Sequence, residues 1–285
     1  MPRLTDFHGL RCYGLDCTLH SPQPLTLRGY YGGVLRGVIG HALFRGNCVY
    51  PEPRCAECAL RSGCPYPQVF KPHLLPGQDD RLPPYLLHRW QPAPQGLRFS
   101  LLLLNPALGF AENWLRQMNQ FLPELDFGGQ YGVRLQEIRD LASDQPVFRE
   151  GHFIRGARLN PLQPALPDSD RVTVQWRTPL VSKHQHDDPL ISALRTRLQR
   201  LVNAYGDGQP LAPPETVPWR LVSARLRQQA ITQGLDSRRR IKGLCGELEL
   251  ADLTPLGAQW LAAGSLLHAG GEATLGFGRY QWASP

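Results

Sequence analysis

The chain has 285 residues, which is long for one domain and sufficient for two that each bury a core. A hydrophobic fraction of 42% and a mean hydropathy of −0.31 are those of a globular protein, and the longest apolar run, around 101–104, is far too short to cross a bilayer. The net charge of +7 permits a nucleic-acid partner without proving one, and the first residues lack an apolar signal segment. We therefore expect a cytoplasmic protein with no membrane partner.

The first half of the chain is predicted to mix strands and helices. Strands are expected over 10–21, 97–106 and 132–141, and helices over 25–46 and 107–122. The stretch 71–96 is rich in proline and charge and is predicted to be a loop. The order strand, helix, strands, helix, strand is that of a ferredoxin-like or RRM-like domain.

The first predicted helix carries two interior glycines. Its apolar side chains share one face, while Gly37 and Gly40 are expected on the other. Because glycine costs about 1 kcal/mol in a helix interior, the pair indicates a close approach by something else. Tight backbone packing and an approaching ligand backbone both remain open.

A cysteine-rich insert over 48–66 follows this helix. Its four cysteines have the spacing C-x6-C-x2-C-x5-C and are Cys48, Cys55, Cys58 and Cys64. One close pair and four thiols in a short segment are typical of a tetrahedral structural zinc site. Four reduced thiols, or an iron–sulfur cluster, are the alternatives. We expect either metal site to be structural and not catalytic.

The second half repeats the order of the first. We expect strands over 171–182, 219–232, 237–253 and 277–282, and helices over 188–208 and 256–270, separated from the first half by a loop-rich stretch, 144–170. The sequence thus predicts an α+β protein of two tandem ferredoxin-like domains with antiparallel sheets, 1–142 and 143–285, the first holding the cysteine-rich insert.

A glycine-rich stretch stands near the end of the chain, with Gly270, Gly271, Gly276 and Gly278 followed by Arg279. A dinucleotide-binding or Walker A loop is excluded, because no helix can follow and no Gly-Lys-Ser/Thr is present. Two hypotheses remain for this stretch. It is either a tight hairpin or a loop whose backbone N–H groups face a polyanion.

A basic segment precedes it, formed by Arg238, Arg239, Arg240 and Lys242. Such a cluster is either a solvated turn or a clamp for RNA phosphates. Of the 31 basic residues only Lys71, Lys183 and Lys242 are lysine, and arginine suits phosphate forks best, although a bias towards arginine codons gives the same count.

Several segments, in this order, resemble the CRISPR repeat-processing endoribonucleases of the RAMP superfamily. They are LRGVIGHAL, the cysteine insert with QVFKP, LRFSLLLLNPAL, FGGQYGVRLQEI, RTPLVS, RRRIKGLCGELEL and LHAGGEATLGFGRYQW. The resemblance implies two tandem ferredoxin-like domains and metal-independent cleavage of repeat RNA, with a 2′,3′-cyclic phosphate product. It also implies a protein that stays bound to the crRNA hairpin and joins other CRISPR effector subunits.

The resemblance also suggests catalytic residues. Many members place a histidine on the first helix, where His41 stands, as the general base or acid. Tyr31 and Arg28, just before the helix, would contact the RNA, and Arg36 would add charge, since some members use basic residues instead of histidine. Related backbone subunits bind RNA without cutting it, so a non-catalytic crRNA-binding subunit is the alternative.

Overall fold

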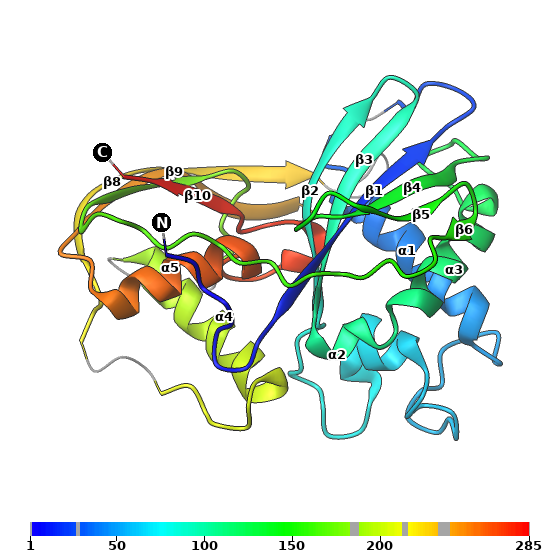
Figure 1. Ribbon diagram of the computed structural model, residues 1–285, viewed down its shortest axis with the longest axis horizontal. Helices are drawn as coiled ribbons and strands as arrows, with labels where there is room; N and C mark the ends of the chain where they lie inside the picture. The colour runs from blue at the N-terminus through cyan, green and yellow to red at the C-terminus, as the bar shows by residue number, and fades with distance from the viewer. Residues whose placement is uncertain (1, 27–28, 183–187, 213–215, 233–239, 285) are drawn as a thin grey trace. The chain divides into compact units, whose positions relative to one another are not determined.

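The computed structural model describes residues 2–26, 29–182, 188–212, 216–232 and 240–284. The chain forms two compact units (Figure 1). The first unit is 12–162, and the second joins residues up to Arg11 to 163–232 and 238–285. Among the described residues, no helix is long and apolar enough to cross a membrane.

A six-stranded antiparallel sheet forms the first unit, in the order β2-β3-β1-β4-β5-β6. Its strands are β1 (Cys12–His20), β2 (Tyr85–Ala93), β3 (Gly96–Leu104), β4 (Arg134–Asp140), β5 (Pro146–Arg149) and β6 (His152–Phe153). Its helical segments are α1 (Gly32–Asn47), η1 (Tyr66–Phe70), η2 (Pro72–Leu74), α2 (Asn105–Leu108), α3 (Ala111–Phe121) and η3 (Leu122–Glu124). Because β5 and β6 extend this sheet, the first unit continues past residue 142.

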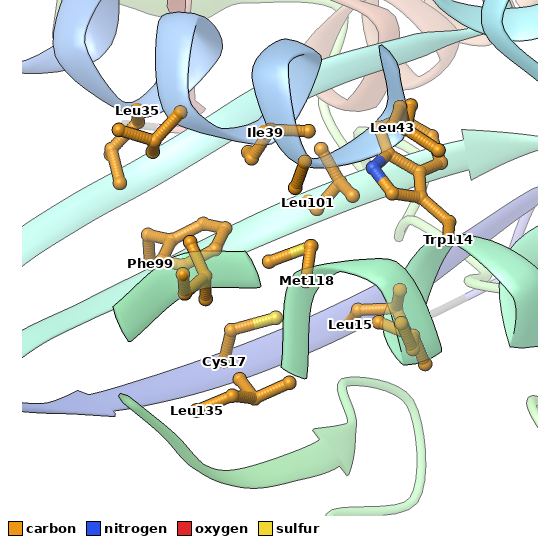
Figure 2. Packing of buried hydrophobic residues seen from close by; sticks show 14 of the residues in the cluster. Leu15, Cys17, Leu35, Ile39, Leu43, Phe99, Leu101, Trp114, Met118 and Leu135 are labelled. Carbon is orange, nitrogen blue, oxygen red and sulfur yellow. The ribbon is translucent and has the colours of Figure 1, made fainter. Parts of the chain in front are cut away.

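Helices α1 and α3 cover one face of this sheet (Figure 1). In α1, Leu35, Ile39 and Leu43 recur every four residues and therefore share one stripe, and all three are buried. Figure 2 shows this stripe above Phe99 and Leu101 of β3. Burying each such side chain contributes roughly 1.5–3 kcal/mol, so this layer fixes how α1 lies on the sheet.

The second unit repeats the arrangement with four antiparallel strands in the order β10-β7-β9-β8. Its elements are β7 (Val172–Trp176), α4 (Pro189–Tyr205), β8 (Arg220–Thr232), β9 (Arg240–Ala251), α5 (Pro255–Leu267), η4 (Ala273–Leu275) and β10 (Tyr280–Ala283). Helices α4 and α5 lie on one face of the sheet (Figure 1). In both units the first and third strands are central neighbours, with the second and fourth outside them, which confirms the predicted tandem ferredoxin-like fold.

Strand β2 corrects the prediction of a loop over 71–96. Its first residues, Tyr85, Leu86 and Leu87, are buried, whereas its later residues alternate between half-buried and exposed and include Pro92. Proline is tolerated here because β2 is an edge strand and pairs only with β3. The composition of this segment is therefore typical of a loop, although its backbone forms a strand. Strands β5 and β6 likewise interrupt the predicted loop 144–170.

The N-cap of α4 is Asp188, whose carboxylate accepts hydrogen bonds from three residues. The Asp188 carboxylate accepts hydrogen bonds from the backbone N–H groups of Leu190 and Ile191, at 3.0 and 3.1 Å. It also accepts one at 2.6 Å from the indole N–H of Trp219, a buried residue. The cap thus joins the start of α4 to the segment before β8.

We expect Asp188→Ala to lower the free energy of unfolding by about 2 kcal/mol, because it removes a helix cap and leaves a buried indole N–H without its acceptor. Denaturant titration of the whole protein measures this change. Asp170→Ala, which removes an exposed carboxylate, is the control and should change stability little. Equal effects of the two substitutions would contradict the role given to Asp188.

Candidate active site

His41 lies on the exposed side of α1, in the first unit. No hydrogen bond or ion pair from a described residue holds its imidazole. Helix α1 is fixed by its buried stripe, so the ring stands on a rigid element while remaining open to solvent. An exposed imidazole on a rigid element is a candidate for general acid–base chemistry.

The two glycines of α1 have different surroundings. A side chain at Gly40 would place its Cβ 2.2 Å from the ring of Phe70, so Gly40 permits tight packing of η1 on the helix. At Gly37, by contrast, a Cβ would meet no atom within 4 Å. Gly37 lies one turn before His41, so open space adjoins the imidazole. Packing therefore accounts for Gly40, whereas the approach of a ligand backbone at Gly37 stays a prediction.

Tyr31 is a core residue, which corrects its expected contact with RNA. Only 1% of its surface is exposed, and its hydroxyl donates a 2.9 Å hydrogen bond to the carbonyl of Phe127. Burial, with a smaller contribution from Asp126, raises the pKa of Tyr31 to about 12. The phenol therefore stays protonated and anchors the start of α1. Arg28 lies outside the described residues.

Arg36 points towards the segment that follows the cysteine insert. Its guanidinium carbon lies 4.9 Å from the centre of the Phe70 ring. Five residues of an α-helix separate Arg36 from His41, so the two side chains leave the helix about 140° apart. The structure therefore places Arg36 against an aromatic ring and does not group it with His41.

The four cysteines of the insert lie on turns and helix ends. Cys48 caps the C-terminus of α1, Cys55 and Cys58 lie in consecutive turns, and Cys64 precedes η1. All four are free thiols. Among the described residues, no group of three or more His, Cys, Asp or Glu side chains has a geometry that holds a metal ion.

The basic segment of the second unit lies on the β8–β9 hairpin. Arg240 is paired with Thr232 at the outer end of the hairpin, and Lys242 with Ala230. Both basic side chains are exposed, and no ion pair to a described residue neutralises them. Arg238 and Arg239 lie outside the described residues. The described part of the segment thus presents two charges to solvent.

The glycine-rich stretch is a turn between α5 and β10 whose N–H groups serve the fold. Those of Gly270, Gly271, Gly276 and Gly278 donate to carbonyls of Ala193, Val181, Ala273 and Pro179. Gly270 and Gly278 have φ of +72° and +73°, and a Cβ there would lie 2.3 and 1.9 Å from backbone oxygens. Conformation and close packing therefore explain these glycines, and the structure favours the tight-turn hypothesis. Arg279 is half-buried beside this turn.

Sequence reasoning missed a polar cluster on the sheet face opposite α1. Asp16 is 4% exposed, and its carboxylate accepts a 2.9 Å hydrogen bond from Arg98 and lies near Arg89. Arg139, on the next strand, is paired in register with Asp16. The sign available in the sequence was an acid between Leu15 and Cys17 in an otherwise apolar strand.

A cavity of about 640 Å³ in the first unit was also missed. Its lining includes His20, Arg134, Asn119 and Glu150 but not His41. His20 and Arg134 are cross-strand neighbours of β1 and β4. Because the pairing of β1 with β4 brings His20 and Arg134 together, no local sequence pattern predicts the cavity.

Comparisons with known proteins assign the first unit to a family. Residues 10–162, more than half of the chain, match the family model AF_1859_N, described as an N-terminal domain. The chain belongs to this family. The matched range covers the AF_1859_N domain from just before β1 to the end of the first unit, and so includes α1 and the insert. No curated protein matches the sequence.

Solved structures resemble the chain beyond the AF_1859_N domain. Thermus thermophilus Cas6 has 17% identity and a TM-score of 0.52, over 96% of this chain and 99% of that one. The same Cas6 in a product complex gives 19% identity, a TM-score of 0.56 and the same coverage. A partial Cas6-RT-Cas1–Cas2 complex has 12% sequence identity and a TM-score of 0.59, over 98% of this chain and 47% of that chain. At such identities these matches establish the fold, which is the one implied by the resemblance to repeat-processing endoribonucleases.

We expect the same substitution at the two glycines of α1 to have opposite effects. Gly37→Ala should raise the free energy of unfolding by up to about 1 kcal/mol, because alanine favours helix and the space is open. Gly40→Ala should lower it by about 1–3 kcal/mol, because Phe70 is packed against its neighbours and cannot move freely. Denaturant titration of both variants checks the pair, and a stabilised Gly40→Ala variant would refute the packing of Phe70 on α1.

Proposed function

We propose that this protein is a metal-independent endoribonuclease that cleaves CRISPR repeat RNA to make crRNA. The observation that carries the proposal is His41, a solvent-exposed imidazole on a rigid helix beside the open space at Gly37. The fold supports it, because the solved structures that resemble the chain include a Cas6 product complex. The residue roles below rest on this chain's own geometry.

In the proposed reaction a ribose 2′-oxygen attacks the adjacent phosphorus. The new 2′-O–P bond forms while the P–O5′ bond breaks, which leaves a 2′,3′-cyclic phosphate and a 5′-hydroxyl. His41 removes the proton from the 2′-hydroxyl or delivers one to the leaving 5′-oxygen. The space at Gly37 lets the RNA backbone come close enough to align the attacking oxygen with the leaving group.

Positive charge is needed while the phosphorus carries five oxygens. We assign this role mainly to Arg28, which precedes α1 in the sequence, and to a lesser extent to Arg36. Arg36 stacks on Phe70, so it acts on a phosphate only where the RNA passes over that edge of the helix. Tyr31 has no part in the chemistry, because its hydroxyl is buried and bonded.

The RNA is held, in this proposal, by exposed charge away from His41. Arg240 and Lys242 on the β8–β9 hairpin would contact phosphates together with Arg238 and Arg239. Arg279 and the turn that holds Gly270, Gly271, Gly276 and Gly278 would shape the neighbouring surface. The N–H groups of these glycines are used within the fold, so charge and turn shape carry this contact. We further propose that the protein keeps its hairpin product. We also propose that it joins CRISPR protein complexes, since a Cas6 occurs in a Cas6-RT-Cas1–Cas2 complex.

The first test is cleavage of the repeat RNA encoded beside the gene. Wild-type protein should cut it in excess chelator and leave a 2′,3′-cyclic phosphate, and His41→Ala should reduce the single-turnover rate by roughly 100-fold or more with RNA affinity retained. His152→Ala, which removes another exposed histidine of the same unit, is the matched control and should leave the rate unchanged.

Other outcomes separate the rivals. Tight binding of the repeat with no cleavage by wild-type protein would favour a non-catalytic crRNA-binding subunit. A 3′-hydroxyl product would indicate a metal-dependent nuclease. Full activity of His41→Ala together with loss in His20→Ala would move the active site to the 640 Å³ cavity.

A second test addresses the hairpin. The double variant Arg240→Ala/Lys242→Ala should bind repeat RNA more weakly, and the slope of its log K against log salt should fall by about 0.7 for each single-strand phosphate that it no longer neutralises. Arg155→Ala/Arg158→Ala removes the same charge from exposed positions of the first unit and is the control. Equal salt slopes for the two double variants would show that net charge, and not the hairpin, determines binding.

A further inference from the structure

The four cysteines of the insert surround one small cavity. Its volume is about 20 Å³, and its lining contains Cys48, Cys55, Cys58 and Cys64 together with Asn47 and Tyr66. A cavity of this size accommodates about one water-sized particle. Four cysteines spread over a turn-rich segment therefore line one space of a size that suits a single ion.

Three separate pieces of backbone bring these thiols together. Cys48 is fixed at the end of α1 by a 2.8 Å hydrogen bond from its N–H to the carbonyl of Phe44. Cys55 and Cys58 belong to two successive turns, closed by bonds from Cys58 to Cys55 and from Arg61 to Cys58. Cys64 lies two residues before η1, and its carbonyl accepts a hydrogen bond from the N–H of Gln68 in η1.

Hydrophobic burial holds this segment at few points, since Cys55 reaches the core and Cys64 packs against it. Between Cys48 and Cys64 the side chains are mostly exposed, including Val49 at 67% and Leu60 at 59%. The structure describes every residue of 48–64 and forms no helix or strand there, between α1 and η1. A segment without a core of its own needs another source of order, and a metal ion bound by thiolates can supply the folding free energy.

We propose that Cys48, Cys55, Cys58 and Cys64 bind one zinc ion in a closed, tetrahedral, structural site. The thiols share the cavity but do not have coordination geometry, so binding requires their side chains to rotate towards its centre. All four ligands come from protein, so no position remains for substrate. The site is therefore structural and does not depend on the proposed nuclease activity.

The proposed zinc site would connect α1, which carries His41, to η1, which packs against it. Cys48 ends α1, and Cys64 leads into η1, whose Tyr66 ring lies 5.3 Å from the ring of Phe44 on α1. Phe70, at the end of η1, packs on Gly40. Zinc would thus clamp η1 against the helix that carries His41.

Metal analysis of the purified full-length protein tests the site. We expect about one zinc per chain, and an apoprotein titrated with cobalt(II) should show the d–d absorption of tetrahedral thiolate coordination. Cys58→Ser should lose most of the bound zinc. Cys245→Ser, which removes a half-buried cysteine on the β8–β9 hairpin, is the control and should keep it.

Hydrogen exchange provides a readout that does not require any variant to fold. Removing zinc from the wild-type protein should speed amide exchange in 66–70 and in the last turn of α1, and leave α4 and α5 unchanged. Metal-free wild-type protein with no cobalt(II) binding, iron in place of zinc, or disulfides within the insert would overturn the proposal. Zinc retained by Cys58→Ser, or lost equally by Cys245→Ser, would also overturn it.

Discussion

The packing of α1 onto the six-stranded sheet is the contact on which the rest of the first unit depends. Leu35, Ile39 and Leu43 enter a layer completed by β3 and by α3 (Figure 2). Because protein interiors are close-packed, this layer fixes both the position of α1 and its rotation about its own axis. Once the rotation is fixed, every other face of the helix has a determined role.

Each remaining face of α1 has different surroundings. The face at Gly40 receives the ring of Phe70, which ties η1 to the helix. The face at Gly37 and His41 has open space at its glycine and an exposed imidazole. Arg36 lies on the Gly40 side of the helix, away from His41, and stacks on Phe70. Helix α1 is therefore held by packing on the sheet and on η1, and it keeps the His41 imidazole accessible in a fixed position.

The second unit uses its glycines differently from what their density suggested. Their N–H groups and their positive φ angles serve a turn between α5 and β10, so little of that backbone remains to face a ligand. The exposed charges of Arg240 and Lys242 stand instead on a long antiparallel hairpin. Electrostatic attraction of a polyanion acts over several ångströms and does not need exact geometry. Exposed basic side chains at the end of a strand are therefore sufficient to attract RNA phosphates.

The amino-acid sequence by itself determined the repeated order of strands and helices, the apolar stripe of α1 and the clustering of four cysteines. These features are local, because periodicity and spacing report on neighbours within a few residues. Only the tertiary structure decided that Tyr31 is buried, that Gly37 and Gly40 differ, that 85–93 is an edge strand, and that Asp16 meets Arg98. Each of these depends on contacts between residues far apart in the chain, such as Gly40 with Phe70 or Tyr31 with Phe127. A pattern of residue types says which side chains prefer burial, but the three-dimensional packing alone selects the partner each one meets.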